Sequence, residues 1–416
     1  MVFRDNLEKD EFNSFVNDKV GGSFTQNFAW AKFKENNGGI KTYLVGMEDD
    51  KGRLVAVSML LYAYKRKIKN VYAPSGPVLD YGNREIVKAF FDYLTDFVKK
   101  LGAEVLEIEP AYVIREYNKK LEVINEYDDN IVKNLESVGF GHLGYVGQVA
   151  GYQLRYTSII DLTKTEEELV NGFAKDKKKL LNRNEKYFNI KVEDAELEDL
   201  VYLEKFRRQL SEKKDFKLES NNYYRECYEV FKEHEDARII KAVINFKEIE
   251  KTISEELKSL KEELKTSKKT KDVENVINSL EQKLVEIADF SKKHENESGI
   301  IVGIGLIVYV GKRATYIYEH TDKELGNFGI PTIMLNELIL DSKNRGCVEF
   351  DMLGLPNPNY KNNKNYSITE FKISFGGNII EYVGVFIKPV KKVKFFVKNF
   401  MKNVTYNMRG IANERK

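Results

Sequence analysis

The chain has 416 residues, more than one ordinary domain needs, and 42% of them are hydrophobic, which is enough for two buried cores. With 67 Lys and Arg against 65 Asp and Glu, its charge excludes wholesale coating of nucleic acid but leaves room for one basic face. The two cysteines, Cys227 and Cys347, lack metal-ligand spacing and indicate a reduced compartment.

The N-terminal stretch is charged and lacks an apolar signal segment, and the longest apolar run, 299–311, is too short to cross a bilayer. We therefore expect a cytoplasmic protein.

Helix and strand signals alternate along residues 1–152, and a similar order returns in 153–245 and 298–388. Apolar spacing of three and four predicts helices at 8–17, 84–101, 130–138, 197–210, 223–232 and 330–344. Alternating or β-branched runs predict strands at 42–47, 54–64, 104–108, 237–245, 300–310, 314–319 and 348–353. The pattern predicts an α/β (α+β) protein with two domains of similar rhythm.

Residues 246–297 interrupt the second domain with a segment rich in Lys, Glu and Leu, Ile or Val. Narrow apolar seams on either side of the polar link 266–271 predict two helices that fold back as an antiparallel coiled-coil arm. Because each seam is narrow, we expect the arm to be separable from the domain core. Residues 389–416 form a basic amphipathic helix in this prediction, which either packs on the last domain or touches anionic lipid.

The sequence shows no phosphate-binding loop, nucleophile elbow or His-Glu metal motif, so no metal site is expected. An enzyme that handles an already activated acyl group needs little covalent machinery. It positions an amine beside an ester and stabilises the developing oxyanion, which lysines and aromatic side chains in a cleft can do.

Four stretches, in this order, resemble the Fem family of peptidoglycan-branch aminoacyltransferases (FemABX and MurM). They are Phe24–Lys34 with its Trp-Ala-x-x-Lys pattern, Gly76-Pro-Val78 followed by Glu109-Pro110, Thr315–Tyr318 with 336–338 and 349–354, and Phe371-Lys-x-x-Phe-Gly-Gly377. The resemblance implies two acetyltransferase-type (GNAT-like) domains, with aminoacyl-tRNA as co-substrate and no other cofactor. The implied acceptor is the stem-peptide amine of lipid II or UDP-MurNAc-pentapeptide. The arm resembles that of the FemA, FemB and MurM type.

The same resemblance assigns the candidate site. Lys34, beside Trp30, matches a lysine that contacts the precursor's phosphates, and Tyr223, Tyr224 and Tyr318 match tyrosines on the precursor side. Where the family usually has an Arg four residues before this tyrosine pair, the chain has Glu219, for which Lys217 or Arg225 could compensate. A structural role remains the alternative for each.

Phe371 and Lys372 match the pair beside the tRNA 3′ end, where a lysine balances charge as the ester is attacked. We place them on a strand before the Gly376–Gly377 turn, so that their side chains point to opposite faces. Glu109 is a weaker candidate for the general base.

Two other functions remain open at this point. An acyl-CoA N-acyltransferase would need a glycine-rich pyrophosphate loop before a helix, of which Gly326-Asn-Phe-Gly329 is a poor version. A non-enzymatic RNA-binding or scaffold protein would use the arm to recruit a partner.

Overall fold

The computed structural model describes residues 1–18, 23–65, 68–128, 130–143, 155–211, 222–233, 236–265, 270–294, 299–359, 361–363 and 365–391. The basic C-terminal helix predicted for 389–416 falls almost entirely outside these ranges. None of the helices within them combines the length and the apolar content that a bilayer crossing requires.

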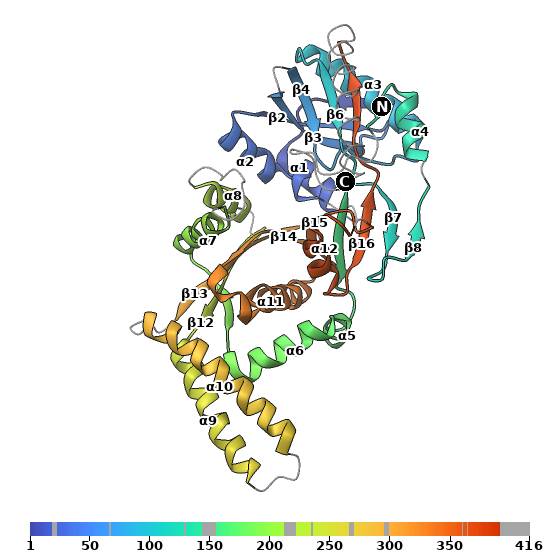
Figure 1. The fold of residues 1–416 in the computed structure, drawn as a ribbon. Coiled ribbons are helices and arrows are strands. Elements are labelled where there is room, and N and C mark those ends of the chain that lie inside the picture. The colour runs from blue at the N-terminus through green and yellow to red at the C-terminus, as the bar shows by residue number, and fades with distance from the viewer. Residues whose placement is uncertain are drawn as a thin grey trace.

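The first domain is a mixed sheet with strand order β1-β2-β3-β4-β6-β17-β9, and helices cover it (Figure 1). Its strands are β1 (Val2–Arg4), β2 (Lys41–Glu48), β3 (Leu54–Lys65), β4 (Ile68–Ala73), β5 (Val78–Leu79), β6 (Val105–Ile108), β9 (Gly141–His142) and β17 (Phe386–Pro389). Its helices are α1 (Lys9–Asn17), α2 (Phe28–Gly38), α3 (Arg84–Lys100) and α4 (Asn130–Ser137). Phe90, Phe91 and Leu94 of α3 are fully buried in its core, as their helical spacing predicts.

The second domain has strand order β11-β12-β13-β14-β15-β10-β16-β7-β8. These strands are β7 (Val113–Tyr117), β8 (Val123–Glu126), β10 (Tyr156–Asp161), β11 (Lys191–Asp194), β12 (Ala237–Ile244), β13 (Ile300–Val310), β14 (Arg313–Thr321), β15 (Glu349–Leu355) and β16 (Asn378–Tyr382). Its helices are α5 (Glu166–Gly172), α6 (Lys175–Arg183), α7 (Val201–Ser211), α8 (Tyr223–Lys232), α11 (Ile330–Asn344) and α12 (Tyr366–Ile373). The predicted α/β class is confirmed, and the strands form two sheets.

The two sheets exchange strands, which the boundaries drawn at 152 and 388 miss. The hairpin β7–β8 comes from the N-terminal part of the chain but pairs with β16 in the second sheet. In return, β17 lies directly after β16 in sequence but pairs with β6 in the first sheet. Local patterns predict strands but not their partners, because pairing is decided by long-range contacts.

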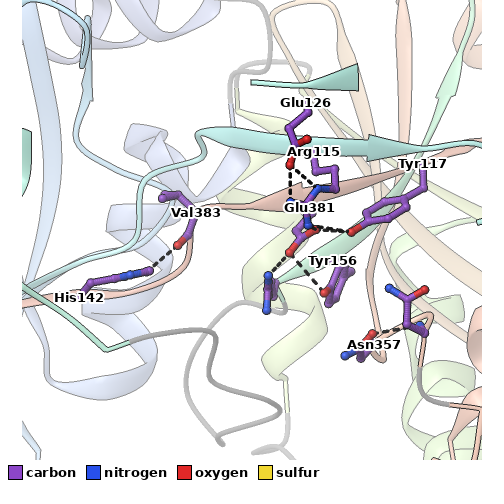
Figure 2. Close-up of polar contacts among 10 residues, drawn as sticks. Arg115, Tyr117, Glu126, His142, Tyr156, Asn357, Glu381 and Val383 are labelled. Atoms are coloured by element: carbon purple, nitrogen blue, oxygen red, sulfur yellow. Dashed lines mark hydrogen bonds and ion pairs between the residues drawn. The ribbon is translucent and has the colours of Figure 1, made fainter. Parts of the chain in front are cut away.

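A buried carboxylate marks the place where the chain crosses between the sheets (Figure 2). Glu381 on β16 is only 1% exposed. The Tyr117 hydroxyl donates to its Oε2 at 2.5 Å, the Arg115 Nη1 lies 3.4 Å from the same oxygen, and Arg155 pairs with Oε1. These partners belong to β7 and to the start of β10, so one charge holds together strands that are far apart in sequence.

Helices α9 (Phe246–Leu264) and α10 (Thr270–Lys293) form the expected projecting pair (Figure 1). They run antiparallel, because Ser291 bonds to Glu250 at 2.8 Å near one end and Lys261 pairs with Glu281 at 2.6 Å farther out. The base of the pair is not separable from the domain. Phe246 stacks on Phe290 at 5.4 Å and lies 6.1 Å from Phe328, a core residue of the second domain.

Only the outer part of the arm should therefore be dispensable for folding. Replacing 259–282 with a short Gly/Ser linker keeps Phe246, Ile249, Ile253 and Ile287, and we expect its free energy of unfolding to stay within about 1 kcal/mol of wild type. Replacing all of 247–297 removes several buried apolar side chains and should cost more than about 4 kcal/mol. Urea unfolding followed by circular dichroism measures both, and equal losses would contradict this division.

Candidate functional site between the two domains

Helix α2 presents a cation on an aromatic surface at the border of the two domains. Asn27 caps the helix by accepting a hydrogen bond from the Ala29 N–H at 2.8 Å. One turn apart, Trp30 and Lys34 lie on the same helix face, and the Lys34 Nζ is 4.3 Å from the Trp30 ring centroid. Phe33 lies 5.1 Å from the same nitrogen.

The second domain extends this surface with three tyrosines. The ring of Tyr223 on α8 meets Phe33 edge-on at 5.0 Å, and its hydroxyl lies 3.0 Å from the hydroxyl of Tyr318 on β14. Tyr224 packs on Tyr318 at 5.0 Å. The structure thus brings together five residues predicted separately, namely Lys34, Trp30, Tyr223, Tyr224 and Tyr318. We call them, with Phe33, the aromatic group.

Glu109 directly follows β6 and is linked through Tyr72 to the apolar cluster that contains the aromatic group. Its carboxylate accepts a hydrogen bond from the Tyr72 hydroxyl on β4 and is 7% exposed. Tyr72 packs against the same apolar cluster as Trp30 and Tyr318. Of the residues proposed to compensate for Glu219, Lys217 lies outside the described ranges, as Glu219 itself does, and the Arg225 guanidinium donates to the Leu197 carbonyl at 3.5 Å.

Phe371 and Lys372 lie on helix α12, so the predicted strand is wrong. Alternation over five residues cannot separate a short strand from one helical turn, and the deciding contact is distant in sequence. The Thr369 hydroxyl on α12 donates to the Pro356 carbonyl at 3.2 Å, which fixes the helix against the end of β15. Adjacent helical residues still diverge: Phe371 packs on Phe375 at 5.3 Å, whereas Lys372 points to β15.

The Lys372 ammonium is held by backbone carbonyls. Its Nζ lies 2.5 Å from the carbonyl oxygen of Met352, 3.0 Å from that of Leu353 and 2.8 Å from that of Gly354. An ammonium has three N–H donors, so these three acceptors occupy all of them. Burial lowers its pKa to about 8, against the opposing fields of Asp351 and Glu319. Lys372 can therefore act on its surroundings through its charge and not through a free N–H.

Glu319 is a candidate that the sequence analysis missed. It follows Tyr318 on β14, and burial raises its pKa to about 7, although the positive charges of Lys323 and Lys372 act in the opposite direction. The available signal was a carboxylate inside the aromatic and β-branched run that begins at Thr315. Within the described ranges, no three His, Cys, Asp or Glu side chains are grouped as metal ligands.

A model of the FemAB family matches residues 7–403. The chain belongs to the FemAB family. Among its relatives is the Aminoacyltransferase FemA of Staphylococcus epidermidis, 28% identical over 425 residues that cover 96% of this chain and 99% of the relative. The Aminoacyltransferase FemA of Staphylococcus aureus is 27% identical over 426 residues, covering 96% and 98%.

Solved structures extend the FemAB comparison to the fold. The crystal structure of FemX has a TM-score of 0.75 at 22% identity and covers 94% of this chain and 98% of its own. A tandem GNAT protein from the clavulanic acid biosynthesis pathway reaches a TM-score of 0.50 at 9% identity, covering 94% and 98%. These likenesses confirm the two GNAT-like domains.

The raised pKa of Glu319 predicts a pH-dependent cost to stability. Below pH 4.5, the ordinary pKa, the carboxyl is protonated in the folded and the unfolded protein, so its burial does not lower the free energy of unfolding. Above pH 7 the carboxyl is ionised in both, and the loss of stability is complete. The difference between the folded and unfolded pKa values corresponds to a free energy of about 3 kcal/mol. Glu319→Gln should therefore match wild type near pH 4.5 and be more stable by up to about 3 kcal/mol at pH 8.

Urea titrations at several pH values test this expectation. Glu324→Gln is the matched control, because Glu324 is a 61% exposed carboxylate paired with Lys293 at 3.0 Å. A Glu319→Gln difference that stays constant from pH 4.5 to 8 would show that the carboxyl is not held away from water.

Proposed function

We propose that the protein is an aminoacyltransferase that moves an amino acid from aminoacyl-tRNA to the stem-peptide amine of a peptidoglycan precursor, lipid II or UDP-MurNAc-pentapeptide, and so builds the interpeptide bridge. One observation carries the proposal beyond family membership. The aromatic group with Lys34 and the partly buried side chains of Glu319 and Lys372 adjoin the same strand, β14, which suits two substrates that meet there.

The aromatic group is the acceptor side in this proposal. Lys34 is a point charge held over an indole ring, so its ammonium has a fixed position from which to meet a diphosphate. Burial raises the pKa of Tyr318 well above its ordinary value, which keeps the hydroxyl protonated and able to donate. The bond between the Tyr223 and Tyr318 hydroxyls uses one O–H, so the pair presents the other O–H to the sugar or peptide part of the precursor.

The α12 side is the donor side. Lys177 of α6 lies 5.0 Å from the Phe371 ring, and from there α6 leads towards the arm, where Lys186 pairs with Glu256 at 2.6 Å. Lys175, Lys179 and Arg183 are exposed at intervals of four residues and so form one basic face of α6. A basic face of this kind suits the phosphate backbone of an RNA whose 3′ end is at Phe371.

The reaction needs only positioning and charge. The stem-peptide amine attacks the ester carbonyl, a C–N bond forms, and the C–O bond to the tRNA ribose breaks, with the amine proton leaving to the solvent or to Glu109 and the ribose oxygen gaining one. The Lys372 ammonium favours the oxyanion by its charge, in a site where burial strengthens that field.

One contact disfavours the acyl-CoA alternative. Gly329 is the N-cap residue of α11, at the position where a pyrophosphate would need open backbone. A Cβ added to Gly329 would lie 2.0 Å from the Leu180 Cδ1 of α6, so this side chain already covers the loop.

The direct experiment is transfer from a mixed pool of radiolabelled aminoacyl-tRNAs to lipid II and, separately, to UDP-MurNAc-pentapeptide, with mass analysis of the product. Acetyl-CoA is the competing donor. A labelled branch from tRNA supports the proposal. Transfer from acetyl-CoA alone, or RNA binding without any transfer, would replace it with one of the two other functions.

Lys34 should act on the acceptor alone. Lys34→Met removes the charge and keeps the apolar stem on Trp30, so we expect the KM for the precursor to rise about 10–100-fold, with an unchanged KM for tRNA. Lys32→Met is the control, because Lys32 is 40% exposed and pairs with Glu233 on the surface. With an acceptor peptide that lacks the diphosphate, Lys34→Met and wild type should have the same KM for the acceptor. Weaker binding of both substrates would instead indicate a role in folding.

The basic face of α6 should act on the donor alone. Lys179→Glu with Arg183→Glu reverses two exposed charges. At low salt the variant's KM for aminoacyl-tRNA should exceed that of wild type, and this difference should shrink at higher salt, because salt weakens the phosphate contacts of both proteins. Steady-state kinetics at two salt concentrations measure this. The reversal Lys99→Glu, on the exposed side of α3 in the first domain, is the control. A raised KM for the precursor would contradict the assignment.

A further inference from the structure

Strands β14 and β15 pair in parallel only at their beginnings. The register joins Arg313 to Glu349 and Thr315 to Asp351 and goes no further. Beyond that point β15 remains paired with β10, whereas β14 continues beside β13 to Thr321. Helix α12 lies at the end of β15 (Figure 1), and its Lys372 bonds to the Met352–Gly354 carbonyls on that side of the split.

Two enclosed oxygens lie on the β14 side of this split. The Oε1 of Glu319 and the hydroxyl of Tyr316 are shielded from solvent, and neither has a hydrogen-bond partner among the described residues. Both adjoin Gly305 on β13. Glu319 is its register partner, and a Cβ added to Gly305 would lie 2.6 Å from the Tyr316 hydroxyl.

A β-bulge puts these two side chains on the same face. Tyr316 is opposite Ile307 and Tyr318 is opposite Leu306, so Ile317 is an extra residue. Tyr316 accordingly packs in the core with α11, while Ile317 and Tyr318 pack in the cluster that contains the aromatic group. The residue after Tyr318 is then turned to the Tyr316 side.

The chemistry of the pair calls for a cationic donor. A carboxylate oxygen that is shielded from water and accepts no hydrogen bond lowers the stability of the fold. Lys372 does not supply the missing donor, because its three N–H groups are bonded to backbone carbonyls and it forms no ion pair with Glu319 within the described part of the chain. Burial holds the pKa of Glu319 at about 7, so an arriving cation would also favour the ionised form.

We propose that Glu319, assisted by the Tyr316 hydroxyl, binds the α-ammonium of the aminoacyl group on the donor. This inference rests on the proposed function. An aminoacyl ester differs from a plain acyl ester by this one cation, which lies one carbon from the carbonyl. Glu319 would hold it while the Lys372 charge faces the carbonyl oxygen, so that the site selects aminoacyl donors and fixes the carbonyl face presented to the acceptor amine.

The test compares donors that differ only in that group. Glycyl-tRNA and alanyl-tRNA are converted by nitrous acid to glycolyl-tRNA and lactyl-tRNA, which carry a hydroxyl in place of the ammonium. We expect wild type to prefer the aminoacyl donors in kcat/KM by about 10–100-fold, the range for one charged hydrogen bond. In Glu319→Gln the preference should fall to within about threefold, with the hydroxyacyl rates nearly unchanged.

Two further variants sharpen the comparison. Tyr316→Phe should lower the preference partly, and Glu324→Gln should leave it intact, because Glu324 lies on the surface. Urea unfolding confirms that each variant is folded before its kinetics are compared.

The other outcomes overturn the inference in distinguishable ways. If Glu319→Gln slows aminoacyl and hydroxyacyl donors equally, the carboxylate acts on the acceptor amine or as a base and does not recognise the donor. If the preference survives in Glu319→Gln, another group recognises the ammonium. If wild type transfers from no charged tRNA, the proposed function fails and this inference fails with it.

Discussion

The buried charge of Glu381 is the interaction on which the arrangement of the two domains depends. Carboxylates are almost never fully buried unless paired, and here two arginines and the Tyr117 hydroxyl surround one (Figure 2). Removing one partner would leave an uncompensated charge in the interior, so the three strands that supply the group are held in one arrangement. Immediately after Glu381, Val383 donates to the Tyr112 carbonyl at 2.9 Å, and its own carbonyl oxygen lies 2.8 Å from the His142 Nε2. The crossing to the first sheet is fixed within two residues of that carboxylate.

The position of Glu381 also affects the candidate site, because the strands around it connect the two sheets that carry that site. With β17 in the first sheet and β7 in the second, neither domain has a complete sheet from one continuous stretch of chain. The chain therefore passes between the two sheets both after β6 and after β16, and these adjacent connections limit how far the domains can move apart. Helix α2 of one domain and α8 of the other stay in contact, as the Lys32–Glu233 pair at 3.1 Å and the Phe33–Tyr223 contact show. A site assembled from both domains needs this rigidity, because small shifts in position are costly for a reaction that depends on orientation.

The sequence predicts what is local and misses what is distant. Helices at Tyr223–Lys232 and Ile330–Asn344 have the predicted bounds, because an apolar face at helical spacing needs no information from elsewhere. Phe371–Lys372 was misplaced because Pro356 and the β15 carbonyls decide its conformation. The resemblance identified the members of the aromatic group, but only the fold shows that they touch. Glu319 was missed for another reason: a single carboxylate in a strand looks like a solvent-facing residue until its surroundings are known.

In the proposed function β14 adjoins two substrates, and its bulge gives the strand two chemically different faces for them. In a regular strand, alternate side chains share a face, so Tyr316 and Tyr318 would point the same way and Glu319 the other way. The inserted Ile317 breaks the alternation, sends Tyr318 to the aromatic group and returns Glu319 to the side of Tyr316. The Tyr318 hydroxyl thus faces one side, while the Glu319 Oε1 and the Tyr316 hydroxyl, which lack hydrogen-bond partners among the described residues, face the other. In the proposed function, the residues assigned to the acceptor and to the ester, Tyr318 and Glu319, are therefore consecutive on a strand held in a sheet. The bulge interrupts the regular strand pairing, and the shielded Glu319 carboxyl beside it lowers stability. The proposed function accounts for both features, because it places one substrate on each face of β14.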